Sequence, residues 1–267
     1  MDKTWPDDAV AGEFSRLAYV RFERDGAYRT VVADAVGALG YRDVGFFSDG
    51  SRNGAHGLDG QGFAGLRADG HAIIAFRGTQ PDSLRDVLSD VRALPVSWTG
   101  AGRVHRGFND ALLGLLPQVD RWIADRRIVQ LTVTGHSLGA AMATLFAARH
   151  RDADLVTFGS PRVGDAAFAT AWEGRTMRRY VDCTDLVAHL PPKAIGYRHL
   201  DGLRYIDATG HVHLGDALGP VMLCRDQIRA RRAFRRVVSW NTAPFRGLAD
   251  HAPINYISAI LGCRIGP

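Results

Sequence analysis

Apolar residues run almost without interruption through residues 71–78, HAIIAFRG, between two glycines. Such a run is typical of a β-strand that is buried on both faces of a sheet. Residues 129–134 predict a second strand, and an alanine-rich helical pattern follows to about residue 150. DLVTFGS, at 154–160, then predicts a further strand. Two consecutive strand–helix units favour a parallel sheet that is covered by helices.

Three other segments have apolar residues at helical spacing. Residues 28–40 predict a helix that ends on a glycine stop signal. Residues 82–95 place five apolar side chains on one stripe, the pattern of an amphipathic helix. Residues 109–127 predict a helix that is kinked near Pro117, because proline lacks the helical hydrogen-bond donor.

The C-terminal third has a different pattern. Asp201-Gly202 separates two alternating runs in residues 197–206, which is a strong β-hairpin signal. We therefore expect an antiparallel hairpin beside the parallel sheet. Residues 223–240 hold six arginines and place apolar residues on one helical side. Such a basic amphipathic helix can dock on an anionic membrane or simply present a solvated face, and the sequence leaves both open.

Length and composition fit one α/β domain over residues 1–267, because neither a repeat nor a linker divides the chain. With 46% hydrophobic and 23% charged residues, the composition is that of a soluble globular protein. No stretch approaches 18 uninterrupted apolar residues, so we expect no membrane-spanning helix.

The net charge of +5 comes almost entirely from arginine, since lysine occurs only at Lys3 and Lys193. No nucleic-acid-binding motif accompanies that charge, and we expect no nucleic-acid partner. Cys183, Cys224 and Cys263 are odd in number and lack a CxxC pair, which excludes a disulfide framework and a zinc site of usual spacing. We expect three buried apolar thiols.

The motif Gly135-His136-Ser137-Leu138-Gly139 stands where the second strand meets its helix. A glycine-flanked turn with a capping serine would explain it. A nucleophile on a strained strand-to-helix turn would also explain it, because small residues are needed two positions before and after such a serine. The context favours the nucleophile, since the following alanines keep the helix thin and the helix N-terminus directs N–H groups at the reacting centre.

A nucleophilic serine needs a histidine base, and that histidine needs a carboxylate to orient it. His150 lies about three helical turns from Ser137, too far to serve. Residue spacing does not choose among the later histidines, which are His189, His199, His211, His213 and His251. Nor does it choose among the acids, which are Asp165, Asp182, Asp185, Asp201, Asp207, Asp216 and Asp250.

Six motifs occur in the order seen in the lipase class 3 family, the fungal triacylglycerol-lipase-like α/β-hydrolases. They are AFRGT, VHRGF, TVTGHSLGAAMA, TFGSPRVGDAAFA, DCTDLVAHLPP and LADHAPINYI. The chain resembles this family from about residue 71 to residue 256, whereas the first 70 residues match only loosely. The resemblance implies an α/β-hydrolase fold with a mostly parallel central sheet flanked by helices and with a helical lid.

The resemblance also assigns roles to individual residues. It implies that Ser137 is the nucleophile, Asp185 the acid and His251 the base. The backbone N–H groups of Thr79 and Leu138 are expected to form the oxyanion hole.

In the family, the segment after the oxyanion residue forms a lid over an acyl-binding cleft. Here that segment is 82–95, whose apolar stripe suits a lid but equally suits a helix packed on the body. Many family members carry a tryptophan where this chain has Val87, which weakens the expectation of interfacial activation.

The resemblance implies a serine hydrolase that cleaves carboxylic esters, acylglycerols first, with neither a metal nor an organic cofactor. Phospholipase A1 or short-chain esterase activity is the near alternative, and a non-catalytic membrane-associated protein on the same fold is the rival. The expected partner is a lipid or ester substrate, with peripheral contact to a lipid surface. The first residues lack a signal-peptide pattern, which favours the cytoplasm, whereas many family members are exported. Nothing in the sequence predicts the oligomeric state.

Overall fold

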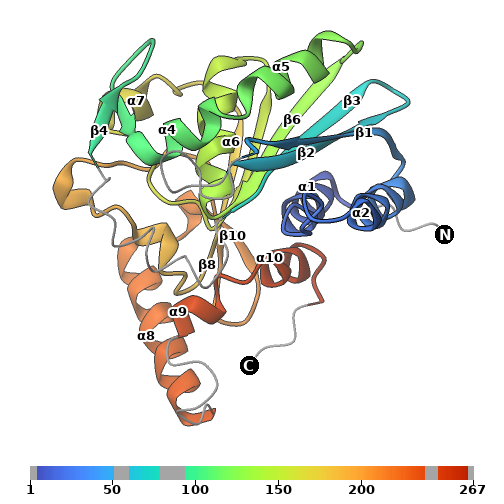
Figure 1. Cartoon of the computed structure of the whole chain (residues 1–267). Helices are drawn as coiled ribbons and strands as arrows, with labels where there is room; N and C mark the ends of the chain where they lie inside the picture. The colour runs from blue at the N-terminus through green and yellow to red at the C-terminus, as the bar shows by residue number, and fades with distance from the viewer. Residues whose placement is uncertain (1–4, 51–59, 79–93, 238–245, 264–267) are drawn as a thin grey trace.

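An eight-stranded sheet forms the centre of the computed structural model, which describes residues 5–50, 60–78, 94–237 and 246–263. The strands lie in the order β1-β2-β3-β6-β7-β8-β9-β10. Their bounds are β1 Tyr41–Ser48, β2 Gln61–Arg67, β3 His71–Phe76, β6 Gln130–His136, β7 Asp154–Phe158, β8 Met177–Asp182, β9 Leu203–Ile206 and β10 Val212–Leu214. Strands β3, β6, β7, β8 and β9 are parallel, which confirms the predicted mostly parallel sheet (Figure 1).

Both edges of the sheet are antiparallel. Strands β1, β2 and β3 form one antiparallel edge, which the sequence pattern did not predict. At the other edge, β9 and β10 form the expected C-terminal hairpin, but its turn lies at residues 207–210. The prediction of a turn at Asp201-Gly202 was wrong, because residues 197–200 form no strand and β9 instead pairs in parallel with β8.

Helices cover both faces of the sheet (Figure 1). Helices α4, α5 and α6 pack on one face, and α1, α2 and α10 pack on the other. The bounds are α1 Asp7–Leu17, α2 Gly26–Ala38, α4 Arg106–Leu113, α5 Leu116–Ala124, α6 Leu138–Arg149, α7 Ala166–Thr170, α8 Pro220–Val237, α9 Arg246–Ala249 and α10 Pro253–Ile260. A short ribbon of β4 Pro95–Ser97 and β5 Arg103–His105 precedes α4.

Two separate helices, α4 and α5, lie where the sequence of residues 109–127 predicts one kinked helix. Helix α4 ends at Leu113 and α5 begins at Leu116, so the prediction of a single helix was wrong. Pro117 lies in the first turn of α5, where its missing N–H has no intrahelical partner to lose.

The buried strand and the alanine-rich helix lie where the sequence predicts them. Every residue of β3 is buried. Helix α6 follows β6 directly and is buried from Leu138 to Ala147. Small side chains along α6 let this helix lie close to the sheet, so the β6–α6 junction is held rigidly from both sides.

The predicted lid, residues 82–95, lies outside the described residues except for Leu94 and Pro95. The assignment of this lid and of a single domain over 1–267 therefore stays a prediction. Among the described helices, none combines the length and apolarity that crossing a membrane requires.

Candidate active site

Ser137 stands at the junction of β6 and α6 with a backbone that few residues other than glycine adopt. Its φ of 60° and ψ of −127° lie outside the usual regions for an L-residue. Such strain costs on the order of 1–3 kcal/mol and persists only where the surrounding structure enforces it. Here the Ser137 amide donates to the Phe158 carbonyl at 3.0 Å, which fixes the turn to the end of β7.

The glycines around Ser137 are required by close backbone approach. A Cβ on Gly135 would lie 2.7 Å from the Ala140 nitrogen, and one on Gly139 would lie 2.8 Å from the Phe76 carbonyl carbon. Contacts this short essentially never occur. The two glycines therefore let strand β3, strand β6 and helix α6 meet at the serine.

Asp185 and His251 form a buried pair. His251 Nδ1 lies 2.9 Å from Asp185 Oδ2 and 3.0 Å from Oδ1, although 66 residues separate them in the chain. Burial alone would raise the pKa of Asp185, but the charge and hydrogen bond of His251 lower it below its usual value. Because a carboxylate only accepts, Nδ1 carries the proton, and Nε2 of a neutral ring is left as the basic nitrogen.

Tyr256 is a further residue of the site that sequence reasoning missed. Its hydroxyl donates to Asp185 Oδ2 and accepts from the Asp182 amide at 3.4 Å. The tyrosine is completely buried on α10, and burial raises its pKa well above the usual value. It therefore stays a proton donor that holds the carboxylate in place. Asp182, another acid that residue spacing left open, contacts this hydroxyl through its backbone amide.

His136, adjacent to the serine, is held in one tautomer. Its Nε2 lies 2.7 Å from the His251 carbonyl oxygen, which can only accept, so Nε2 donates. Its Nδ1 lies 2.7 Å from the Tyr19 hydroxyl, which must then donate to a neutral ring. Burial, reinforced by the charge of His251, lowers the pKa of His136 well below the usual value. With both nitrogens occupied, His136 is not available as the base for Ser137.

Two buried polar atoms of this site lack a hydrogen-bond partner among the described residues: Ser137 Oγ and His251 Nε2. These are the two atoms that a nucleophile–base pair brings together. The residues are close, since the His136 ring before the serine lies 4.3 Å from the His251 ring, centroid to centroid. Such bonds are often long before substrate binds.

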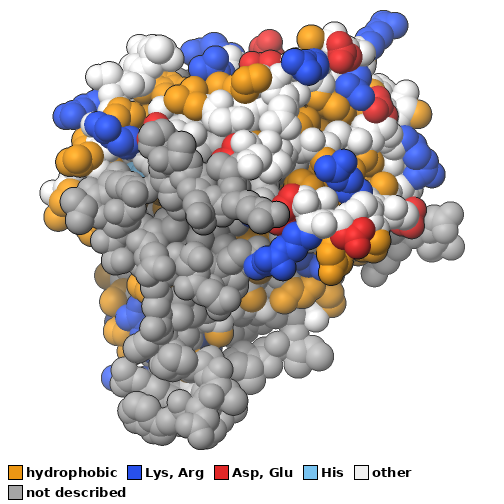
Figure 2. All heavy atoms as spheres, viewed as in Figure 1, with side chains coloured by type: hydrophobic (Ala, Val, Ile, Leu, Met, Phe, Trp, Pro, Cys, Tyr) orange, Lys and Arg blue, Asp and Glu red, His pale blue; other side chains and the backbone are white. Residues whose placement is uncertain are grey.

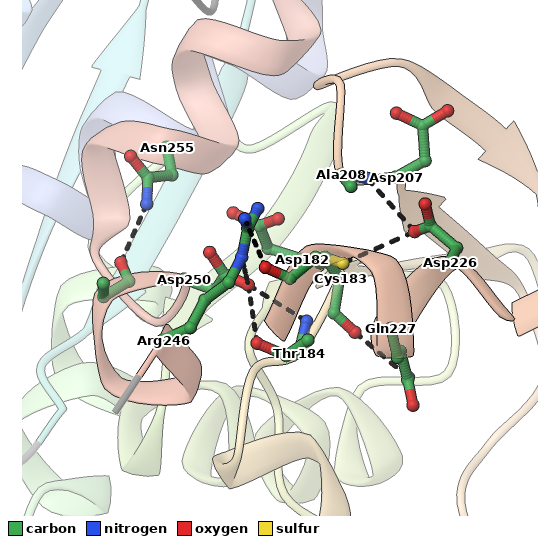
Figure 3. Close-up of polar contacts among 12 residues, drawn as sticks. Asp182, Cys183, Thr184, Asp207, Ala208, Asp226, Gln227, Arg246, Asp250 and Asn255 are labelled. Carbon is green, nitrogen blue, oxygen red and sulfur yellow. Dashed lines mark hydrogen bonds and ion pairs between the residues drawn. The ribbon is translucent and has the colours of Figure 1, made fainter. Parts of the chain in front are cut away.

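A buried ion pair joins the loops of Asp185 and His251 (Figure 3). Asp250 Oδ2 accepts from the Thr184 amide at 3.1 Å, from the Thr184 hydroxyl at 2.8 Å and from Arg246 Nε at 3.1 Å. Thr184 directly precedes Asp185, and Asp250 directly precedes His251. The second arm of Arg246 donates to the Ala230 carbonyl of α8 at 3.2 Å.

The inward side of helix α8 is hydrogen-bonded to Cys183, in the loop that leads to Asp185 (Figure 3). Asp226 accepts from the Cys183 thiol at 3.4 Å and from the Ala208 amide at 3.1 Å, while Gln227 donates to the Cys183 carbonyl at 3.1 Å. Cys183 is buried, but Cys224 and Cys263 are exposed, so the prediction of three buried thiols was wrong for two. Cys224 is exposed because it lies on the solvent side of α8.

The two expected oxyanion donors are the backbone amides of Leu138 and Thr79, and the structure describes the first of them. Leu138 opens α6, where the first amides of a helix have no intrahelical acceptor. Thr79 lies outside the described residues, but its neighbour Gly78 approaches the site closely. A Cβ on Gly78 would lie 3.1 Å from the Ser137 Cβ. The chain that leads to Thr79 therefore passes beside the serine.

Arg162 lies away from these groups. It donates from Nη1 to the carbonyls of His189 and Pro191, the latter at 2.7 Å, and so joins two loops. Among the described residues, no group of three or more histidine, cysteine or acidic side chains is arranged to hold a metal ion.

Comparison with known proteins finds similarity to lipases. The family model described as Lipase (class 3) matches residues 73–195. A solved triacylglycerol lipase, described as having a serine protease triad as its catalytic centre, superimposes with a TM-score of 0.61 at 28% identity. The match covers 78% of this chain and 82% of that one.

Over residues 73–195, slightly less than half of its length, the chain matches the lipase class 3 family. Its fold is the α/β-hydrolase fold of the solved fungal lipases, as the resemblance implies. The curated lipase of Rhizomucor miehei is 36% identical over 143 residues, which cover 47% of this chain and 39% of that protein. A secreted mono- and diacylglycerol lipase of Malassezia globosa is 30% identical, over 47% of this chain and 48% of that protein. The chain thus matches less than half the length of these two relatives.

Proposed function

We propose that this class 3 lipase is a serine hydrolase that cleaves carboxylic esters of acylglycerols. Ser137 is the nucleophile, His251 the base and Asp185 the acid that orients it. The hydrogen bond between His251 Nδ1 and Asp185 carries the proposal most directly, because it leaves Nε2 as the basic nitrogen, a buried atom without a partner among the described residues, close to the buried turn that holds Ser137.

The reaction follows from these positions. Ser137 Oγ bonds to the ester carbonyl carbon as its proton passes to His251 Nε2, and the negative charge develops on the carbonyl oxygen. The Leu138 amide, together with that of Thr79, stabilises this oxyanion; each such donor contributes roughly 3–4 kcal/mol. The C–O bond then breaks, and His251 protonates the leaving alcohol. Water, activated by the same histidine, releases the acid from Ser137.

Acylglycerols are favoured as the substrate because curated relatives include mono- and diacylglycerol lipases. Phospholipase A1 and short-chain esterase activities remain the alternative assignment, since the residues that would shape the acyl cleft include the predicted lid at 82–95. Several of these relatives are described as secreted, which supports export over the cytoplasm for this chain.

The test is a p-nitrophenyl ester series of increasing chain length, measured beside triacylglycerol, diacylglycerol and phosphatidylcholine. We expect ester hydrolysis, labelling by a fluorophosphonate, and loss of both in Ser137→Ala, with a fall in kcat of at least about 10⁴-fold. Undiminished hydrolysis by Ser137→Ala would remove the serine assignment. A wild-type protein that neither hydrolyses these esters nor accepts the label would be a non-catalytic member of the fold.

A further inference from the structure

Helix α8 presents an outward face in which apolar and basic residues alternate. Val221, Arg225, Ile228 and Arg232 are spaced by four, three and four residues, so they form one stripe along the helix. All four are exposed, and the exposed fractions of Val221 and Ile228 reach 64% and 42%. Arg229 is also exposed, beside this stripe.

The opposite side of α8 is the side that packs on the body. Ala230 is buried, and Asp226 and Gln227 are half-buried and bonded to the Cys183 loop. Asp226 is the one acidic residue of the helix, and it points inward to the Tyr205 hydroxyl as well, at 2.8 Å. The outward stripe therefore carries positive charge without a carboxylate of its own helix to neutralise it.

No ion pair engages Arg225, Arg229 or Arg232 within the described part of the chain. Helix α8 extends along the lower left of the molecule in Figure 1, and Figure 2, in the same view, shows hydrophobic and basic side chains at the left edge of this region. The family model ends at residue 195, so this helix lies beyond the region that defines the family.

We propose that the outward stripe of α8 is a docking surface for an anionic phospholipid bilayer. Guanidinium groups pair with lipid phosphates, while Val221 and Ile228 enter the headgroup layer between them. Large apolar side chains alternating with arginine suit a lipid interface better than a nucleic acid, whose phosphates are bound by basic and polar groups. A second copy of the same face would bring like charges together.

This surface gives the proposed lipase a means of reaching its substrate, and in that sense it rests on the proposed function. Because Asp226, Gln227 and Ala230 join α8 to the loops of Asp185 and His251, docking would hold the site next to the bilayer. Binding itself does not require hydrolysis, so it can be measured on Ser137→Ala protein.

The experiment is co-sedimentation of the Ser137→Ala protein with vesicles of phosphatidylcholine, with or without about one-third phosphatidylglycerol. We expect binding only to the anionic vesicles, weakened by salt. Each arginine near such a surface contributes about fivefold, so the added changes Arg225→Gln, Arg229→Gln and Arg232→Gln should weaken binding by about 100-fold. Val221→Ser with Ile228→Ser should weaken it by about tenfold.

The matched control removes the same charge from another surface, through Arg121→Gln, Arg127→Gln and Arg149→Gln, all exposed residues. Equal losses in the two triple variants, or equal binding of neutral and anionic vesicles, would overturn the proposal. So would an α8-dependent dimer in size-exclusion chromatography, or tighter α8-dependent binding to an oligonucleotide than to vesicles. Soluble-ester hydrolysis by the α8 variants on the Ser137 background should equal that of wild type, which separates a docking failure from a catalytic one.

A second inference comes from the buried pair beneath the site. We infer that Arg246 and Asp250 are positioning residues, which set the distance between Asp185 and His251 by joining Thr184 to the residue before the histidine. The side chains of Arg246 and Asp250 are only 4% and 5% exposed, so this ion pair is shielded from solvent and salt. This inference also rests on the proposed function.

The test compares Asp250→Asn with Asp8→Asn, which disturbs the ion pair to Arg178 elsewhere. We expect Asp250→Asn to lower kcat per fluorophosphonate-reactive site by about tenfold, with KM within twofold and the acid limb of the kcat/KM profile moved to lower pH. Asp250→Glu should restore part of the rate. Asp8→Asn should lower the melting temperature alone.

A readout without catalysis is the low-field Nδ1 proton resonance of His251 in the NMR spectrum. It should be present in wild type and shifted or lost in Asp250→Asn. An unchanged resonance and pH profile in a folded Asp250→Asn protein would reduce the pair to a purely structural role. That result would leave the proposed hydrolase function untouched, since the wild-type rate tests it separately.

Discussion

Tyr256 donates its hydroxyl proton to Asp185 Oδ2 from helix α10, five positions beyond the histidine that the same carboxylate orients. The carboxylate is thus held by two groups from one short segment, the His251 ring and the Tyr256 hydroxyl. Any shift of α10 would move both together, so the segment acts as one support for the acid.

Tyr256→Phe removes that hydroxyl and leaves Asp185 Oδ2 with one of these two buried donors, His251 Nδ1. A hydrogen bond to a charged group contributes roughly 1.5–3 kcal/mol, so we expect a lower free energy of unfolding in this range. We also expect kcat on a soluble ester to fall about tenfold, because the acid is less firmly held. Tyr28→Phe, at an exposed tyrosine, is the control and should change neither quantity.

Gly159 closes the site at the end of β7. A Cβ there would lie 2.6 Å from Asp185 Oδ2 and 2.9 Å from His251 Nδ1, and its φ is 56°. Gly159→Ala should therefore push the acid and base apart and lower kcat by at least about 100-fold. Gly174→Ala provides the comparison, since its φ is 77° but nothing lies within 4 Å of the added Cβ. It isolates backbone strain, and full activity in Gly159→Ala would refute the steric argument.

The strained backbone of Ser137 predicts that a substitution can raise the stability of the protein while it abolishes the proposed activity. Glycine accepts a φ of 60° without steric cost, whereas alanine retains the strain of the serine. Both Ser137→Gly and Ser137→Ala should be inactive, but the glycine variant should be more stable by about 1 kcal/mol in urea unfolding. If the alanine variant is the more stable of the two, the turn is not strained as inferred.

Two buried histidines, His136 and His199, predict that the folded protein loses stability as the pH falls. Burial lowers the pKa of His136 and of His199 well below the usual 6.5, so the unfolded chain binds more protons than the native state below that pH. Their contribution to stability is therefore full above pH 6.5 and is lost as the pH falls. Each histidine can add up to about 1.4 kcal/mol per pH unit to the slope of the free energy of unfolding against pH.

Urea unfolding at several pH values between 7.5 and 5 measures this slope. His199→Gln keeps a donor for the Ala188 carbonyl but removes the titrating ring, so its slope should be smaller. An identical slope in the variant would mean that other groups carry the pH dependence.

The sequence predicted those features that local patterns specify. The run at 71–78 indicated a doubly buried strand, and the glycines around Ser137 indicated a close strand-to-helix turn. The hairpin was misplaced because the position of β9 depends on pairing with β8, which alternation alone does not report. Two helices replaced the kinked one because the first ends at Leu113 and the second begins at Leu116, with Pro117 in its first turn.

The site itself was only partly predictable. Residue spacing left five histidines open as the base, and the choice of His251 came from family resemblance. Tyr19 and Tyr256 carry no local signal, because their partners, His136 and Asp185, are distant in the chain. The Arg246–Asp250 pair had one local hint, since a spacing of four residues on one helical turn lets the two side chains pair.

The packing of α1 against α10 brings opposite parts of the chain to the same serine. Tyr19, just after α1, holds His136, while Tyr256 on α10 holds Asp185. A fragment restricted to the family-model region, 73–195, would retain Ser137 and Asp185 yet lose the proposed base, His251, and both tyrosines. The proposed catalytic site is therefore completed only in the assembled fold, and the appearance of activity during refolding would report the docking of its outermost helices.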